Sequence, residues 1–179
     1  MMKLILSGLA AILLLLVVVG FVLPTEYEIE ESVAIQATPA QVHAHLEDLE
    51  KWPAWAPWVE ADPTIVTTYG TTTVGVGASQ TWTSESGDGE LELTQCDPAT
   101  GIAYDMAFIS GDTRAPAAAA MSYSASGDTT TVTWTMSGDM GEFMPPVVAG
   151  LMTPIMKSSI GSMFAQGLDK LKLVVESDS

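Results

Sequence analysis

The chain has 179 residues, which is enough for one domain with a single hydrophobic core plus a short additional segment. Its 6 basic and 22 acidic side chains give a formal net charge of −16, which repels nucleic acid and anionic lipid headgroups, so nucleic acid is not expected as a partner. Cys96 is the single cysteine, so no disulfide forms within the chain.

The first element is an uninterrupted apolar run. Residues 4–23 (LILSGLAAILLLLVVVGFVL) carry no charge. As a helix this run is about 30 Å long, the thickness of bilayer hydrocarbon. A cleaved signal peptide is the alternative, but no Ala-x-Ala-like site lies near Leu23. We predict a single transmembrane anchor over residues 1–24 and one domain over residues 25–179.

The charges on either side of the span predict its orientation. Lys3 precedes the span, whereas Glu26, Glu28, Glu30 and Glu31 follow it. Positive charge is favoured on the cytoplasmic side of a membrane. We therefore expect a single-pass membrane protein whose domain lies outside the cytoplasm, in the periplasm of a bacterium.

Residues 27–37 (YEIEESVAIQA) alternate and predict a first strand. Ile29, Val33 and Ile35 are the candidates for its buried face, with a bulge near Glu31 to keep them together. Thr38 and Pro39 are then a typical N-cap and first helical residue. Apolar residues recur at helical spacing at Val42, Leu46 and Leu49. We expect a helix of about three turns that ends before Pro53.

This helix carries both histidines of the chain. Residues two positions apart do not share a helix face, so His43 and His45 are not expected to chelate one metal ion together. His43 shares its face with Glu47 and is predicted to be solvated. His45 lies beside the apolar stripe, where it is either a hydrogen-bonded or half-exposed histidine or an inward-facing acid–base group or ligand contact.

Residues 65–137 are rich in Thr, Ser, Val and aromatic residues, and turn signals recur there at hairpin spacing. We predict about six antiparallel strands, the clearest over residues 78–84, 90–96, 102–109, 117–125 and 129–137. Alternation in the last of these, TTTVTWTMS, places Val132, Trp134 and Met136 on the buried face.

The C-terminal segment returns to helical periodicity. Its apolar stripe consists of Met152, Ile155, Met156, Ile160, Met163, Phe164, Leu168 and Leu171. Gly150 and Pro154 leave the start of this long helix open. A helix with such a stripe must cover another apolar surface.

No catalytic or metal-binding motif stands out. The sequence has no G-x-S-x-G, no H-E-x-x-H and no phosphate-binding glycine loop, and we expect no cofactor and no metal ion. The weak candidates for proton transfer are His45, Tyr104 and Tyr123. Arg114 is the only basic residue between Lys51 and Lys157, and it either pairs with Asp112 or contacts a ligand carboxylate.

This order of elements resembles the polyketide-cyclase-like branch of the START-like (SRPBCC) superfamily. The similar stretches are ATPAQVHAHLEDLEKWPAW at 37–55, the run 75–78 leading to Trp82, and VTWTMSG at 132–138. The resemblance covers residues 26–175. It implies an α+β helix-grip fold, in which a curved antiparallel sheet wraps around a long C-terminal helix and encloses a hydrophobic cavity.

The resemblance also implies a role for the stretch WPAWAPW at residues 52–58, which holds three of the five tryptophans. Trp52, Trp55 and Trp58 either line one mouth of the cavity or plug the open end of the core. The expected cavity residues are Trp55, Trp58, Trp82, Leu93, Tyr104, Met106, Phe108, Met121, Tyr123, Trp134, Met156, Ile160, Met163 and Phe164.

Three functions follow from the resemblance. A hydrophobic small molecule, such as a lipid or a polyketide-like compound, would bind in the cavity of the anchored domain. An enzyme of the cyclase or dehydratase type, using a tyrosine or histidine proton, is the alternative. A protein-interaction domain like that of START-like co-chaperones is the third, and fold alone does not separate them.

Overall fold

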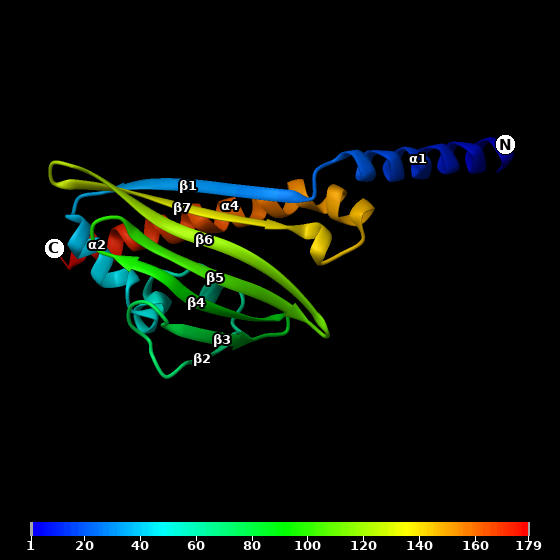
Figure 1. The fold of residues 1–179 in the computed structure, drawn as a ribbon. Helices are drawn as coiled ribbons and strands as arrows, with labels where there is room; N and C mark the ends of the chain where they lie inside the picture. The colour runs from blue at the N-terminus through cyan, green and yellow to red at the C-terminus, as the bar shows by residue number, and fades with distance from the viewer. Residues whose placement is uncertain (1, 179) are drawn as a thin grey trace.

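The structure is a computed structural model and describes residues 2–178 (Figure 1). Its helices are α1 (Met2–Val22), α2 (Pro39–Leu46), the 3-10 helix η1 (Leu49–Ala54), α3 (Trp58–Ala61), the 3-10 helix η2 (Met140–Glu142) and α4 (Pro146–Ser177). Its strands are β1 (Glu26–Ile35), β2 (Val66–Tyr69), β3 (Ser79–Thr83), β4 (Asp88–Asp97), β5 (Gly101–Ser110), β6 (Thr113–Ser126) and β7 (Thr129–Asp139).

The seven strands form one antiparallel sheet in the order β1-β7-β6-β5-β4-β3-β2. The sheet is curved, and α4 packs along one of its faces, mainly against β1 (Figure 1). We call this face the inner face and the opposite one the outer face. The predicted α+β helix-grip fold is confirmed.

Strand β1 differs from the prediction in one respect. It pairs with β7 without interruption from Glu26 to Ile35, so the predicted bulge near Glu31 is wrong. Ile29, Val33 and Ile35 are all odd-numbered and share one face without any irregularity. Glu31 lies on that same face, where Gly161 of α4 leaves room for its carboxylate.

Strands β6 and β2 also differ from the prediction. Strand β6 begins at Thr113 and includes Pro116, because pairing with β7 starts only at Ala117 and the missing proline N–H costs no hydrogen bond to that strand. Strand β2 was not predicted, since its four residues VTTY are too short to show a pattern.

Helix α2 has the predicted N-terminus. The Thr38 side chain accepts from the Gln41 N–H, the Gln41 side chain accepts from the Thr38 N–H, and Pro39 begins the helix. This capping box fixes where the chain leaves β1, and so which face of α2 turns toward the sheet.

Helix α4 runs parallel to β1, and contacts along its length set the register. The Thr153 hydroxyl lies 3.3 Å from the Thr25 carbonyl oxygen near one end, and Lys172 Nζ donates to the Ala34 carbonyl oxygen at 2.9 Å near the other. The helix continues through Pro154, which lies only two turns from its start. Met156 and Ile160 therefore lie near the level of Tyr27 and Ile29 in the sheet.

Helix α1 projects away from the domain (Figure 1). Its last turn meets the first turns of α4 at two glycines: a Cβ at Gly20 would lie 2.4 Å from the Val147 carbonyl oxygen, and one at Gly150 would lie 2.2 Å from the Gly20 carbonyl oxygen. Two helices in the described chain are long and apolar enough to cross a membrane. Ile5–Val22 has a mean hydropathy of 3.0 and is almost wholly exposed, whereas α4 has 1.2 and is partly covered.

Candidate functional site

An aromatic cluster fills the middle of the space between the sheet and α4. Trp52, Trp55 and Trp134 are at most 1% exposed. The Trp134 ring stacks on Phe164 with centroids 3.8 Å apart and an interplanar angle of 4°. Its Nε1 donates to the Tyr104 hydroxyl at 2.9 Å. These contacts leave no open space around the rings, so this part of the inner face is a packed core.

Helix α2 holds two of these tryptophans in place. Trp52 Nε1 donates to the Leu46 carbonyl oxygen at 3.0 Å, and Trp55 Nε1 donates to the His45 carbonyl oxygen at 3.3 Å. Both carbonyls lie in the last turn of α2 and lack a partner within the helix. The stretch WPAWAPW therefore closes one end of the core, and only Trp58 among its tryptophans is half-buried.

The other end of the inner face is less covered. Trp82 and Met106 are half-buried, and Phe108 is 36% exposed. The rings of Trp82 and Phe108 meet edge to face with centroids 6.2 Å apart. Neighbouring β6 offers only small side chains, with Ala115 paired to Phe108 and Ala117 paired to Met106. Large apolar side chains that are incompletely buried therefore lie beside small ones at this end of the inner face.

The facing side of α4 is also only half-buried. Met156, Ile160 and Met163 lie in its middle turns and are half-buried, and α4 packs mainly against β1. We use the name apolar groove for the incompletely buried apolar side chains that the sheet and α4 present on this side, namely Trp82, Met106, Phe108, Met156, Ile160 and Met163. The remaining expected cavity residues divide between Trp58 and Tyr123, which are half-buried at the margin of the core, and a fully buried set. That buried set is Trp55, Leu93, Tyr104, Met121, Trp134 and Phe164.

The three candidate proton donors lie apart from this groove. Burial raises the pKa of Tyr104 far above its usual range, and its hydroxyl is enclosed by the aromatic cluster. His45 Nε2 lies 3.7 Å from the Asp178 carboxylate, and burial lowers the pKa of His45. The Tyr123 hydroxyl lies 3.1 Å from His43 Nδ1, away from the groove residues. No two of the three candidates contact each other among the interactions that the described residues make.

The prediction that His43 is solvated is wrong, because the residue is 4% exposed. Helix α2 turns this side chain toward β4 and β6, where its Nδ1 meets the Tyr123 hydroxyl. Its Nε2 lies 3.4 Å from Cys96 Sγ and 3.6 Å from a Glu47 carboxylate oxygen. Burial lowers the pKa of His43 and raises that of Cys96. The sequence signalled only the His43–Glu47 spacing, since Cys96 is 53 residues away.

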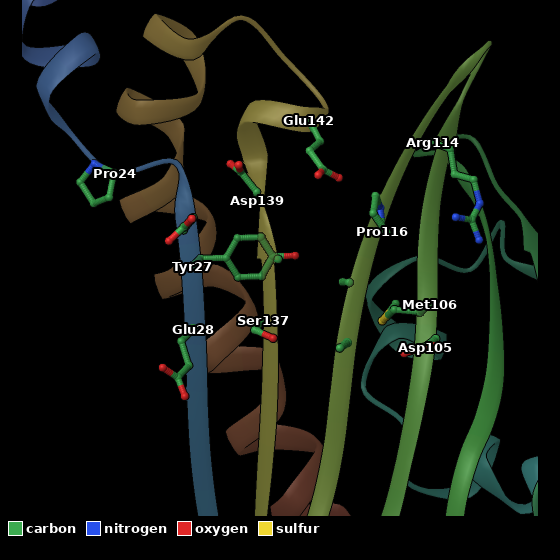
Figure 2. Close-up of a pocket in the computed structure, with 14 residues that line it drawn as sticks. Pro24, Tyr27, Glu28, Asp105, Met106, Arg114, Pro116, Ser137, Asp139 and Glu142 are labelled. Atoms are coloured by element: carbon green, nitrogen blue, oxygen red, sulfur yellow. The ribbon is translucent and has the colours of Figure 1, made fainter.

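Two hollows lie on the outer face, and charged and apolar residues both line them. The larger of these two, of about 870 Å³, crosses β1, β7, β6 and β5 (Figure 2). Figure 2 shows Glu28, Asp139 and Glu142 toward one side of it and Arg114 toward the other. Arg114 pairs with Glu90 rather than with Asp112. The Arg114 guanidinium is thus paired with a carboxylate on the outer face of the sheet. The apolar groove lies on the inner face, so this position of Arg114 does not fit the expected contact with a ligand in the groove.

Comparisons with known proteins agree with this architecture. The family model described as polyketide cyclase/dehydrase and lipid transport matches residues 26–176. A search among curated protein sequences gave no match.

Solved structures share the fold at low identity. A protein from Mesorhizobium loti has a TM-score of 0.62 at 12% identity over 86% of this chain and 99% of its own. A protein from Thermobifida fusca has a TM-score of 0.58 at 20% identity, over 84% of this chain and 93% of its own. Aha1 from Colwellia psychrerythraea, which was solved as a dimer, has a TM-score of 0.56 at 14% identity, over 84% of this chain and 96% of its own. These likenesses show the fold alone, whereas the family model spans nearly the whole domain. The chain belongs to the polyketide cyclase/dehydrase and lipid transport family.

Proposed function

We propose that this protein is a membrane-anchored domain that binds a hydrophobic small molecule, a lipid or a polyketide-like compound, in the apolar groove. The observation that carries the proposal is the incomplete burial of Phe108 and Trp82 at one end of an inner face whose middle is a packed aromatic core. Large apolar side chains left half-open beside small ones mark a place where a further apolar group fits.

The groove lies toward the anchored end of the domain. Helix α4 enters from the α1 junction, and the groove side chains Met156 and Ile160 follow within a few turns. The segment 143–156 contains no charged residue although the chain carries 22 acidic side chains. Val148, Met152 and Ile155 within it are 40–58% exposed. An uncharged apolar surface next to a membrane span suits contact with the bilayer, which would place the groove close to its supply of lipid.

Magnitudes favour binding. Burying one methylene contributes about 0.8 kcal/mol, so an acyl chain with about ten buried methylenes gains about 8 kcal/mol before the cost of association. Methionines suit such a wall because their side chains adapt to irregular apolar shapes, and three of the six groove residues are methionines. Catalysis would in addition need a positioned acid or base at the ligand, and His45, Tyr104 and Tyr123 all lie elsewhere.

The test is photolabelling of the full chain in lipid nanodiscs with a photoactivatable fatty acid, followed by peptide mapping. We expect label on peptides that contain Trp82, Met106 or Phe108, and on α1, which reports contact with the bilayer itself. Phe108→Glu should reduce groove labelling at least tenfold without changing the labelling of α1.

Val76→Glu is the matched control. Val76 is 63% exposed and lies outside the groove, so its replacement should leave groove labelling unchanged. Labelling confined to α1 in the wild type, with a polycyclic probe equally absent from the groove, would contradict the proposal.

A further inference from the structure

Four side chains from three elements meet at the end of the sheet beside α2. His43 and Glu47 come from α2, Cys96 from β4 and Tyr123 from β6. The ligand atoms of His43, Glu47 and Cys96 all lie within 4.8 Å of one another. The function proposed above uses none of these residues, and this cluster is separate from the apolar groove.

We propose that His43, Glu47 and Cys96 bind a zinc ion through the histidine Nε2, a carboxylate oxygen and the cysteine sulfur. Nitrogen, sulfur and oxygen are the donor atoms that Zn²⁺ takes in proteins. Calcium and magnesium ions prefer oxygen alone, so this donor set disfavours them.

The distances fit a tetrahedral ion. With bonds of about 2.0 Å to nitrogen and 2.3 Å to sulfur, tetrahedral angles separate those two ligands by about 3.5 Å. His43 Nε2 and Cys96 Sγ are 3.4 Å apart, and His43 Nε2 and the Glu47 oxygen are 3.6 Å apart. The third pair, Cys96 Sγ and the Glu47 oxygen, lies within 4.8 Å, and Glu47, whose side chain is 40% exposed, is the ligand that turns to close the site.

Tyr123 completes the arrangement from behind. Its hydroxyl holds His43 Nδ1 at 3.1 Å, and with Nδ1 protonated and donating, Nε2 is left as the bare nitrogen that faces Cys96 and Glu47. Histidines that bind metals commonly have their other ring nitrogen fixed by such a hydrogen bond. The ring contact between His43 and Tyr123 is also edge to face, which restrains the imidazole plane.

The charge balance suits a divalent cation. On binding, the Cys96 thiol loses its proton to solvent, and thiolate and carboxylate together neutralise the two positive charges. The negative charge of the Asp97 carboxylate also interacts electrostatically with His43 and Cys96, which adds to the attraction for a cation. Three protein ligands leave the fourth position to water on the side of Glu47, which faces solvent.

The experiment titrates the full chain, in mild detergent and freed of metal with a chelator, with Zn²⁺ against a chromophoric competitor. We expect one saturable site per chain. Cys96→Ser and Glu47→Gln should each weaken Zn²⁺ binding at least tenfold, and Tyr123→Phe should weaken it by about ten- to a hundredfold. Binding of Co²⁺ should give a thiolate charge-transfer absorption that Cys96→Ser removes.

His45→Gln is the control on the same helix, since His45 faces Asp178 instead of the cluster. It should leave Zn²⁺ affinity unchanged. Because Cys96 and Glu47 are not fully buried, their variants are expected to fold, and circular dichroism of the metal-free proteins checks this. One-to-one binding that survives Cys96→Ser, or equal loss in His45→Gln, would show adsorption to the acidic surface and overturn the proposal. The absence of saturable binding would overturn it as well.

Discussion

Trp134 shows how one residue connects several parts of the core. Its ring stacks on Phe164 of α4 and meets Trp55 and Trp58 edge to face, while its Nε1 donates to the Tyr104 hydroxyl. A buried indole N–H that loses its acceptor is costly because water does not replace it. The Tyr104 hydroxyl therefore serves structure here, although the sequence marked it as a candidate proton donor.

Tyr104→Phe tests this role. Removing one oxygen leaves the Trp134 N–H buried without a partner, so we expect the free energy of unfolding to fall by about 1–3 kcal/mol. Thermal and urea unfolding of the full chain in mild detergent measures the change. Tyr69→Phe is the control, because the structure shows no hydrogen bond from the Tyr69 hydroxyl to the described residues. Equal loss in both variants would refute the role assigned to Tyr104.

Sequence reasoning at this scale succeeded for the apolar residues and failed for the polar ones. Alternation in β7 correctly placed Val132, Trp134 and Met136 on the buried face. The helical pattern of α2 misplaced His43, because a polar residue that shares a helix face with Glu47 is typical of a solvated face. His43 faces inward because it contacts Cys96 on β4 and Tyr123 on β6. These residues are far from His43 in the chain, so no local sequence pattern reveals the contacts.

At the scale of elements, α4 links the aromatic core, the apolar groove and the junction with α1. Its C-terminal half seals the aromatic core through Phe164, Leu168 and Leu171, which are at most 6% exposed. Its N-terminal half carries half-open groove residues and meets α1. The sequence predicted the apolar stripe but left the start of the helix open, since Gly150 is a poor helix former. The structure explains this glycine by its close contact with Gly20.

Gly20→Val tests the junction between α1 and α4. A side chain there would meet the Val147 carbonyl, so we expect the first turns of α4 to loosen, with an overpacking cost of about 1–3 kcal/mol. Hydrogen exchange of the full chain in nanodiscs should show faster exchange over residues 147–153. Gly8→Val is the matched control, because a Cβ at Gly8 has nothing within 4 Å. Unchanged exchange in the Gly20 variant would mean that the two helices are not coupled.

At the scale of the whole molecule, charge is the dominant feature. The formal net charge is −16, and the outer face of the sheet carries much of it, for example on Glu26, Glu28, Glu30 and Glu92. Like charges on one surface repel and destabilise the compact state, and salt screens this repulsion.

We expect stability to rise as sodium chloride is raised from about 0.01 M to about 0.15 M, where the screening length falls from about 30 Å to about 8 Å. Thermal unfolding of the full chain in a non-ionic detergent measures this. The double variant Glu28→Gln, Glu30→Gln should show a smaller salt response. Lower stability at the higher salt concentration would indicate that attractive ion pairs, such as Lys170–Glu60, outweigh the repulsion.

The sequence by itself determined most of the elements and their order, although the helix expected to end before Pro53 is divided into α2 and the 3-10 helix η1, which includes Pro53. Periodicity of apolar residues, the Thr38 cap and the turn glycines are local properties, and they predicted six of the seven strands, the long C-terminal helix and the anchor-like first helix. The tertiary structure alone decided which aromatic residues fill the core, which remain half-open, and that His43, Glu47 and Cys96 meet. Those outcomes depend on contacts between residues far apart in the chain, and the packing of α2 and α4 on the sheet sets them.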